Sequence, residues 1–591
     1  MDRPQRRLVV NDVMDALDCD ESDWSSEVDD SDADEDYVQP VNDQESTDEE
    51  ATPDSAPDSD DEPLSSLVRQ PAAPPHTANQ YRWRKADFEP HSFGFTGDEV
   101  RPSVESNVAV DTPLEYFQKF ITMPMLHHLV EQTNIYSVQK YGRCVQTTLK
   151  EMEQLLGIYL QMGLCPMTSM RAFWQSGTRY PPVADVMSRD RFLSLIRSLH
   201  VVNNMDVAEE EKGDDRLWKV RPWLEKLRQQ CIQVEPEEMN SIDEMMVPYK
   251  GTRSPVQQYM RGKPHPWGFK IWARTSVGGI VLDFDVYQGS SSQANGENGL
   301  GVAGNVVVKL CEHLPREKNY KIFADNFFSS VPLVIRLKEM GIHYVGTVRA
   351  NRLKGCILEE EKSMKKRGRG VMDHKVEREN NIIALRWHDT RAVTLISSFA
   401  GREPIDEVRR WNKKQKQHIM VQRPYIIKCY NKCMGGIDLV DACIARFKYP
   451  VKSRRWYIYL FWHSIMIALV NAWMLYRRDA TLLGIAKNEQ LSQRQFQSQV
   501  ASALIHVRTA RPGRPSLLAL GPGSYKPPRK IHCTPVDDVR YDQTAHWPLK
   551  IEKRGRCKVC VTNQTDTSCE KCQVRLCFNE KRNCFRHYHL Q

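Results

Sequence analysis

The chain has 591 residues, of which 40% are hydrophobic and 27% are charged, as in a soluble protein with a sizeable core. Its formal net charge is +6, but residues 1–62 hold 24 acidic side chains and 3 arginines, so the remaining residues carry about +27. An acidic tail on a basic body indicates a polyanionic partner for the body. Six of the 16 cysteines fall between Cys557 and Cys584 and the others are scattered singly, which excludes a secreted disulfide framework and favours a metal site in a reducing compartment.

The first 104 residues are predicted to be an acidic, disordered tail and linker. Residues 1–80 are rich in Asp, Glu, Ser and Pro and contain few aromatic residues, so they cannot bury enough surface to fold alone. Residues 82–85 begin a basic linker around Trp83. No signal peptide is expected, because acidic residues follow the first seven residues, where a long apolar run would be required.

Residues 105–237 are predicted to form the first segment of a helical domain. Thr112 followed by Pro113 is typical of the start of a helix. Apolar residues then recur at spacings of three and four, which predicts further helices over residues 148–162, 189–202 and 215–231.

Residues 238–350 are predicted to form the first part of a mixed α/β core. Short apolar runs between Gly and Pro residues predict its strands. The expected strands are 241–249, 268–274, 279–287, 320–324 and 344–348, and the expected helices are 306–313 and 330–341, after a Gly-, Ser- and Asn-rich loop at 289–304.

Residues 351–423 break this pattern and are predicted to be an insertion domain. They contain two basic segments, 362–369 and 409–416, with short expected strands at 382–386 and 392–398. The second part of the core is expected over residues 424–444, with a helix that begins at Ile437.

Residues 445–505 are predicted to form the second segment of the helical domain, and residues 506–552 a basic linker. The apolar stretch 458–476 is about one bilayer span long. It contains His463, Ser464 and Asn471 and has arginines on both sides, which favours a buried core helix over a membrane span. We therefore expect no membrane association.

Four aspartates stand where metal chemistry would require them. Asp243 lies within the first predicted strand of the core, and Asp325 follows a strand that leads into a helix, at the end where ligands bind in open α/β sheets. Asp438 and Asp441 are three residues apart on a helix and so point to one side. Such carboxylates can hold two Mg²⁺ ions for phosphodiester transfer. Spacing alone fits a turn residue and a solvated helix face better, because those are the commoner uses of aspartate.

Short segments around these aspartates resemble motifs of the piggyBac transposase family and, within it, of the piggyBac transposable-element-derived proteins. They occur in the family's order and are 241–251 (SIDEMMVPYKG), 261–264 (RGKP), 325–330 (DNFFSS), 434–441 (MGGIDLVD) and 453–457 (SRRWY), followed by the C-terminal Cys/His cluster. The similarity extends from about residue 110 to the end of the chain.

The resemblance implies an RNase H-like catalytic core that is split by an insertion domain and flanked by a helical dimerisation and DNA-binding domain made of two segments. It also implies cut-and-paste transposition of double-stranded DNA at TTAA targets by a homodimer, through hairpin intermediates. By motif match, Asp243, Asp325 and Asp438 take the roles of the catalytic triad and Asp441 that of the fourth family aspartate. A nuclear protein is expected, and residues 526–530 (KPPRK) can serve nuclear import.

Basic residues near the core and in the insertion are candidates for phosphate binding, because Lys and Arg supply most nucleic-acid affinity. Taken singly, each is more typical of a solvated surface charge, but as a set they favour a DNA channel. They are Lys250, Arg253, Arg261, Lys263 and Lys270 beside the core, and Lys365, Lys366 and Arg367 in the insertion.

The C-terminal residues 553–591 are predicted to be a cross-brace zinc module. Zinc prefers four S or N ligands in a tetrahedron, and a segment this short needs metal to fold. We expect two ions with interleaved ligands: Cys557, Cys560, Cys577 and Cys584 on one, and Cys569, Cys572, His587 and His589 on the other. The same spacing also suits RING-like and histone-reading modules.

Three functions remain open on this basis. The first is a Mg²⁺-dependent DNA transposase or recombinase of the three-aspartate type. The second is a domesticated, sequence-specific DNA-binding or chromatin protein that keeps the fold without transposition. The third is a chromatin or ubiquitin-pathway adaptor that acts through the zinc module. The intact aspartates favour the first over the second, and the third leaves the α/β core without a role.

Overall fold

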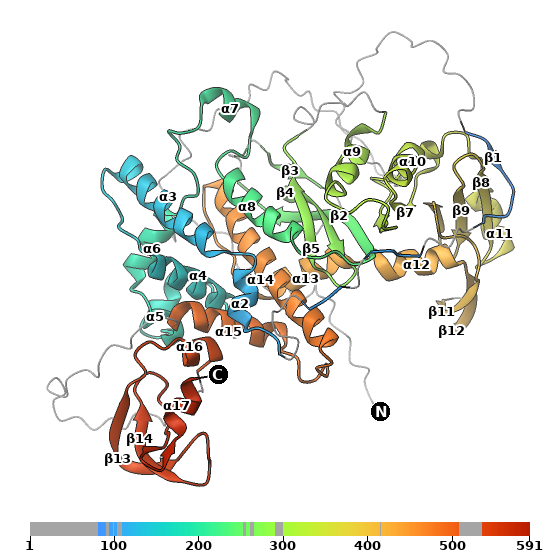
Figure 1. Cartoon of the computed structure of the whole chain (residues 1–591). Helices are drawn as coiled ribbons and strands as arrows, with labels where there is room; N and C mark the ends of the chain where they lie inside the picture. Colours follow the sequence, from blue (N-terminus) through green and yellow to red (C-terminus); the bar gives the residue numbers. More distant parts are fainter. Residues whose placement is uncertain are drawn as a thin grey trace.

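The computed structural model of the chain describes residues 81–89, 94–97, 100–102, 109–251, 254, 256–260, 265–289, 299–413, 415–506 and 535–590. The predicted disorder of residues 1–80 lies outside these residues, as do most of the linker 506–552 and the candidate DNA ligands Arg253, Arg261 and Lys263. Figure 1 shows a helical body, a sheet covered by helices, and a small C-terminal module.

The helical body combines two distant parts of the chain. The first part gives α2 (Pro113–Gln118), α3 (Met123–Tyr141), α4 (Leu149–Leu164), α5 (Pro181–Ala184), α6 (Arg189–Ser198), α7 (Glu209–Asp214) and α8 (Arg221–Ile232), and the second gives α14 (Trp456–Leu482) and α15 (Gln493–His506). The starts of α2 and α4 are fixed by capping boxes, in which Thr112 pairs with Glu115 and Thr148 with Glu151.

Helix α14 lies at the centre of the helical body, where it contacts α2, α8 and α15. It is the one described helix that is long and apolar enough to cross a membrane, but 94% of its most apolar window is buried inside the protein. Two of its buried polar residues are bonded internally: Asn471 accepts from the backbone N–H of Val281 at 2.8 Å, and Ser464 accepts from Trp223 Nε1 at 2.8 Å. The helix therefore packs as the predicted core helix.

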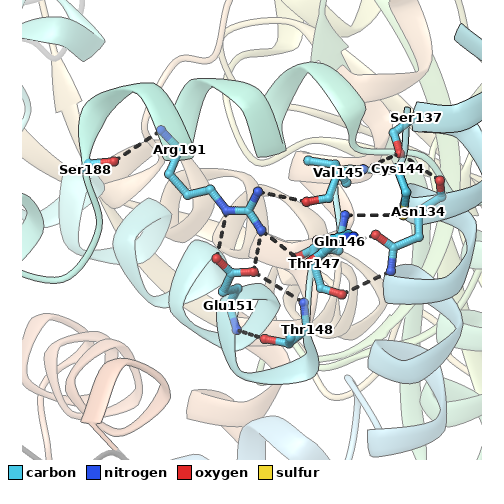
Figure 2. A network of polar contacts seen from close by, with 10 residues as sticks. All are labelled: Asn134, Ser137, Cys144, Val145, Gln146, Thr147, Thr148, Glu151, Ser188 and Arg191. Carbon is cyan, nitrogen blue, oxygen red and sulfur yellow. Dashed lines mark hydrogen bonds and ion pairs between the residues drawn. The ribbon is translucent and has the colours of Figure 1, made fainter. Parts of the chain in front are cut away.

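Figure 2 shows how the loop between α3 and α4 is held in place. Arg191 of α6 donates to Glu151 of α4 at 2.8 and 2.6 Å and to the carbonyl oxygen of Val145 at 2.8 Å. Asn134 of α3 accepts from the backbone N–H of Thr147 at 2.8 Å and donates to the carbonyl oxygen of the same residue at 3.0 Å. These bonds join three helices through one loop and so fix the relative positions of the helices.

The central sheet has the strand order β1-β8-β9-β10-β7-β6-β2-β4-β3, with β5 also paired to β4. Its middle strands β2, β6 and β7 are parallel, and the other pairs are antiparallel. The bounds are β1 (Trp83–Arg84), β2 (Met239–Pro248), β3 (Gln258–Tyr259), β4 (Trp267–Ser276), β5 (Val281–Val286), β6 (Lys321–Ala324), β7 (His343–Thr347), β8 (Met372–Glu377), β9 (Ile382–His388) and β10 (Ala392–Ser397).

Helices cover both faces of this sheet. Helices α9 (Gly301–Leu310) and α10 (Val331–Glu339) pack on one face against Ile242, Ile322 and Ala324. Helix α12 (Tyr425–Cys433) packs on the other face against Phe323 and Val345, and α13 (Gly436–Phe447) packs there against Met245 and Val247. The observed elements confirm the predicted mixed α/β core.

Residues 351–423 do not form a body separate from the core. Their strands β8, β9 and β10 extend the central sheet, because β10 pairs with β7. The same residues also provide α11 (Glu361–Arg367) and a two-stranded hairpin made of β11 (Asp406–Asn412) and β12 (Gln417–Arg423).

The segment predicted as a basic linker after residue 80 is part of the fold. Trp83 and Arg84 form β1, which pairs with β8 at the edge of the sheet, and Tyr81 is buried. Phe88 lies against Gly401, and Phe95 packs on Tyr320 with ring centroids 5.1 Å apart. The prediction was wrong here because an open sheet edge and several aromatic side chains outweigh the basic, turn-like composition.

Candidate catalytic and metal-binding sites

The sheet brings Asp243 and Asp325 side by side. Strands β2 and β6 are parallel, with Ile242 paired to Ala324. Asp243 is the next residue of β2, and Asp325 directly follows the end of β6. Side chains alternate along a strand, so Asp243 continues the face of Met245 and Asp325 that of Phe323. This is the face that α12 and α13 cover.

Helix α13 adds Asp438 from above this face. The helix begins at Gly436, whose backbone lies so close to the sheet that a Cβ atom would come within 2.6 Å of the Ser276 carbonyl oxygen and 2.7 Å of Ser241 Oγ. Asp438 lies in the first turn after this contact. A glycine at the start of the helix therefore lets the carboxylate approach the two strand aspartates.

Tyr430 of α12 lies within reach of the charges of all three aspartates. Burial raises the pKa of its hydroxyl, and the negative charges of Asp325, Asp243 and Asp438 raise it further, against the effect of a hydrogen bond with Thr347. All three charges thus act on one buried atom. The described residues form two groups of metal-binding side chains whose donor atoms all lie within 4.8 Å of one another, and these aspartates belong to neither group.

Asp441 lies one turn further along α13. Its charge acts on Lys448, although burial lowers the pKa of this lysine to about 8. The two aspartates of α13 thus face different surroundings, Asp438 near Tyr430 and Asp441 near Lys448.

Positive charges surround Asp325. Burial and the neighbouring Glu244 carboxylate raise the pKa of Asp325, although Lys270 and Arg349 act in the opposite direction. The Lys270 Nζ atom lies 3.7 Å from Glu244 Oε2 and 4.4 Å from the centre of the Phe327 ring. Of the predicted DNA ligands that lie in the described part of the chain, Lys270 is therefore the one that the structure brings close to Asp325.

The other predicted DNA ligands lie elsewhere or outside the described residues. Lys250 is exposed and lies two residues beyond the end of β2, the strand that contains Asp243. Lys365, Lys366 and Arg367 end α11, which packs on β9, and β9 lies four strands from β2, roughly 19 Å away. Arg367 is also tied to Glu359 at 2.7 Å.

Sequence reasoning missed Arg349 and Arg352. Arg349 Nε donates to Asn326 Oδ1 at 3.4 Å, and Arg352 donates to the carbonyl oxygen of Asn326 at 3.3 Å, so both flank the turn that holds Asp325. They follow β7, the parallel neighbour of β6. The rule that parallel strands present ligand-binding residues beyond their carboxyl ends would have found them.

The C-terminal module contains two groups of four possible metal ligands with interleaved order along the chain. One group is Cys557, Cys560, Cys577 and Cys584, as predicted, and the other is His546, Cys569, Cys572 and His589. The module consists of α16 (Asp537–Tyr541), β13 (Pro548–Arg556), β14 (Gln564–Cys569), β15 (Phe578–Asn579), β16 (Arg582–Asn583) and α17 (Cys584–His589).

The spacing within each group fits a tetrahedral zinc site. Cys560 Sγ lies 3.8 Å from Cys577 Sγ, and His546 Nδ1 lies 3.5 Å from Cys569 Sγ. Tetrahedral bond lengths for zinc place two sulfurs about 3.8 Å apart and a sulfur and a nitrogen about 3.6 Å apart. Both histidines are oriented through their other nitrogen, since His546 Nε2 contacts Asp542 at 3.0 Å and His589 Nδ1 contacts the Phe585 carbonyl oxygen at 2.8 Å.

His587 is not among these ligands, and this corrects the prediction. His587 is exposed, whereas His589 is buried in α17. Residues two apart on a helix point to different sides, so the two histidines cannot both face one ion. His546 takes the fourth position from a segment that was assigned to the linker 506–552, and the module thus begins before residue 553.

Comparisons with known proteins agree with this architecture. The family model described as Transposase IS4 matches residues 112–473. The human PiggyBac transposable element-derived protein 3 is 31% identical over 530 residues, covering 88% of this chain and 84% of that protein. The human PiggyBac transposable element-derived protein 2 is 29% identical over 518 residues, covering 86% of this chain and 81% of that protein.

A solved structure has a similar fold. The cryo-EM structure of a piggyBac transposase synaptic complex with hairpin DNA aligns with a TM-score of 0.59 and 22% sequence identity, covering 81% of this chain and 98% of that one. Family model, relatives and fold all agree, and the chain belongs to the piggyBac-type transposase family.

Proposed function

We propose that the chain is a DNA transposase that cuts and rejoins DNA strands in a metal-dependent reaction, by cut-and-paste at TTAA targets. The observation that carries this proposal is that Asp243 and Asp325 lie side by side, on β2 and just after β6, and that their charges and that of Asp438 in the first turn of α13 all act on Tyr430. The structurally similar piggyBac transposase forms a synaptic complex with hairpin DNA, which supports DNA as the partner of this chain.

The three carboxylates fit Mg²⁺ as metal ligands. Mg²⁺ prefers oxygen ligands and usually keeps several waters, so a few aspartates suffice to bind it. Asp243, Asp325 and Asp438 would hold two ions, with Asp441 alongside. When bound, such ions activate the attacking oxygen and stabilise the leaving oxygen of the phosphodiester.

The protein's own residues would position the carboxylates and the DNA. Asp325 accepts from the backbone N–H of Phe327 at 2.8 Å, which fixes its orientation. Lys270, Arg349 and Arg352 lie around this turn and would bind phosphates on either side of the reacting bond.

The zinc module would bind two Zn²⁺ ions and recognise DNA. Lys553, Arg554 and Arg556 are exposed on β13, and Lys558 is exposed beside the first cysteine pair. Lys571 is not available for this role, because it is buried in an ion pair with Asp542. We further propose that the chain acts as a homodimer in the nucleus.

An excision assay tests the catalytic proposal, with DNA that carries the flanking ends of the chain's own element. Asp243→Asn, Asp325→Asn and Asp438→Asn should each keep DNA binding and lower strand cleavage roughly 100- to 1,000-fold, since metal ions supply several kcal/mol and about 1.4 kcal/mol is tenfold in rate. The change keeps the side-chain volume, so the fold should survive.

Two results would decide against catalysis. Cleavage by an Asp→Asn variant at the rate of the unchanged protein would remove the aspartates from the mechanism. The unchanged protein could also bind the element ends specifically and cleave no DNA in the presence of Mg²⁺. This result would show a DNA-binding protein that keeps the transposase fold but has no catalytic activity.

A further inference from the structure

The hairpin of β11 and β12 has one buried face and one exposed face. Cross-strand pairs join Val408 to Val421 and Arg410 to Ile419, and this face packs toward the core, with Val421 buried. Trp387 Nε1 also donates to the carbonyl oxygen of Gln422 at 2.8 Å, which fixes the base of the hairpin. Figure 1 shows the hairpin at the end of the molecule far from the helical body.

The opposite face of the hairpin presents large side chains to solvent. Arg409 pairs with Met420 and Trp411 with His418 across the two strands, and all four are exposed. Trp411 is 51% exposed and Met420 57%, and the rings of Trp411 and His418 are in edge contact with centroids 5.0 Å apart. Such an aromatic and apolar strip on a monomer surface marks a contact site for a partner.

The charge of the hairpin identifies the kind of partner. At its base, Asp406 is neutralised by Arg423 at 2.7 Å and Lys428 at 3.1 Å. Towards the turn, Arg409, Lys413 and Lys416 form no ion pair with any acidic residue in the described part of the chain. The exposed end is therefore uncompensated and positive, which suits a polyanion.

We propose that this hairpin enters a groove of duplex DNA, with Trp411 as its central contact and the turn lysines on the phosphates. A two-stranded ribbon fits the major groove, and each strand of seven residues is long enough, at roughly 23 Å, to follow it. The inference rests on the proposed function, because it assigns a second DNA contact to the same protein. Strand β12 leads through Pro424 directly into α12, so the contact is joined by one short helix to Tyr430 beside the aspartates.

Binding of the full chain to a labelled 40-bp duplex over a salt series tests this proposal. Lys413→Gln/Lys416→Gln should weaken binding roughly tenfold and lower the salt slope by about 1.8, at about 0.9 for each lost phosphate contact. Trp411→Ala should weaken binding roughly fivefold with the salt slope unchanged, because it removes an apolar contact and no charge.

A matched control is available in the same region. Arg378 and Arg391 are exposed in the two turns that join β8, β9 and β10, and Arg378→Gln/Arg391→Gln removes the same charge. This variant should bind DNA like the unchanged protein. If the hairpin variants match the control, the hairpin proposal is overturned and the exposed face belongs to a protein partner. If the unchanged protein binds no duplex at 50 mM salt, both the hairpin proposal and the proposed function are overturned.

Discussion

His546 belongs to a group of four possible metal ligands in the C-terminal module, and His587 does not. His546 Nδ1 lies 3.4 Å from Cys572 Sγ, within a group of four ligands, whereas His587 is exposed. His546→Ala should therefore lower the zinc content of the chain below two ions, and His587→Ala should leave two ions. Metal analysis of the purified full chain measures both, and equal losses from the two variants would refute this ligand assignment.

Cys569→Ser should unfold the module while the aspartate site stays intact. Cys569 is fully buried, and structural zinc supplies much of the folding free energy of so small a unit. The variant should bind element ends more weakly, with loss of both ions, because the interleaved groups share one core. Retention of one ion and unchanged binding would show that the two groups fold independently.

Asp538 of α16 makes the contact of the C-terminal module with the helical body dependent on pH. Its carboxylate accepts from Thr112 Oγ1 at 2.5 Å, and burial, with Glu115 and Asp537 nearby, raises its pKa to about 6. The folded state therefore holds a proton that the unfolded state has released, and its stability falls as pH rises from about 4 to 6. Asp538→Asn should stabilise the contact above pH 6 by about 1–2 kcal/mol, after allowance for partial exposure.

Amide hydrogen exchange in α16, corrected for the intrinsic effect of pH, measures this change. Protection in Asp538→Asn should exceed that of the unchanged protein at pH 7.5, and the two should agree at pH 4.5. A difference of the same size at both pH values would show that the carboxyl group does not titrate at this contact.

At the scale of elements, the approach of α13 to the sheet depends on Gly436. An added methyl group would meet the Ser276 carbonyl oxygen at 2.6 Å, and backbone atoms cannot move aside as a flexible side chain can. Gly436→Ala should shift α13 and displace Asp438, so we expect strand cleavage to fall more than tenfold while DNA binding persists. A Cβ atom at Gly435 meets nothing within 4 Å, so Gly435→Ala is a matched control.

Cleavage rates of the two glycine variants with one DNA substrate check this expectation. Near-equal rates would show that the close contact at Gly436 does not position the helix. Since Gly435 has φ −81°, alanine adopts its backbone without strain.

At the scale of the whole molecule, the acidic tail and the basic body carry opposite charges of about −21 and +27. We expect the tail to compete with DNA for the body, because its charges are covalently attached and close at hand. Deletion of residues 1–80 should strengthen DNA binding roughly three- to tenfold at 50 mM salt and less at 500 mM, since salt screens the competition. Affinity that is unchanged or weaker across the salt series would contradict this.

The position of that deletion matters, because Tyr81, the residue directly after it, is buried. Deletion of residues 1–80 leaves β1 in place and should keep the melting temperature. Deletion of residues 1–97 also removes Trp83, Phe88 and Phe95 and exposes the edge of β8, so it should lower the melting temperature by roughly 3–6 °C. Equal melting temperatures for the two deletions would show that this segment does not support the sheet.

Most elements of the core and the chemical character of its sites can be predicted from local sequence pattern. The spacing of apolar residues located α4 and α8, and the short apolar runs around Ile242 and Ile322 located the two parallel strands beside which the aspartates lie. The local sequence pattern is sufficient to predict these elements, because each helix or strand must bury one apolar face. The Cys557–Cys560 pair of the first metal group was found for a similar reason, since two cysteines separated by two residues are visible along the chain.

Contacts between residues far apart in the chain became visible in the folded structure alone. His546 replaced His587 because helix geometry separates two histidines that are close in sequence, while a loop brings in one that is remote. Arg349 and Arg352 reach Asp325 because β7 lies beside β6, and residues 81–84 join the sheet because β8 has an open edge. Each of these contacts depends on the pairing and register of strands far apart in the chain, which local pattern and composition do not encode.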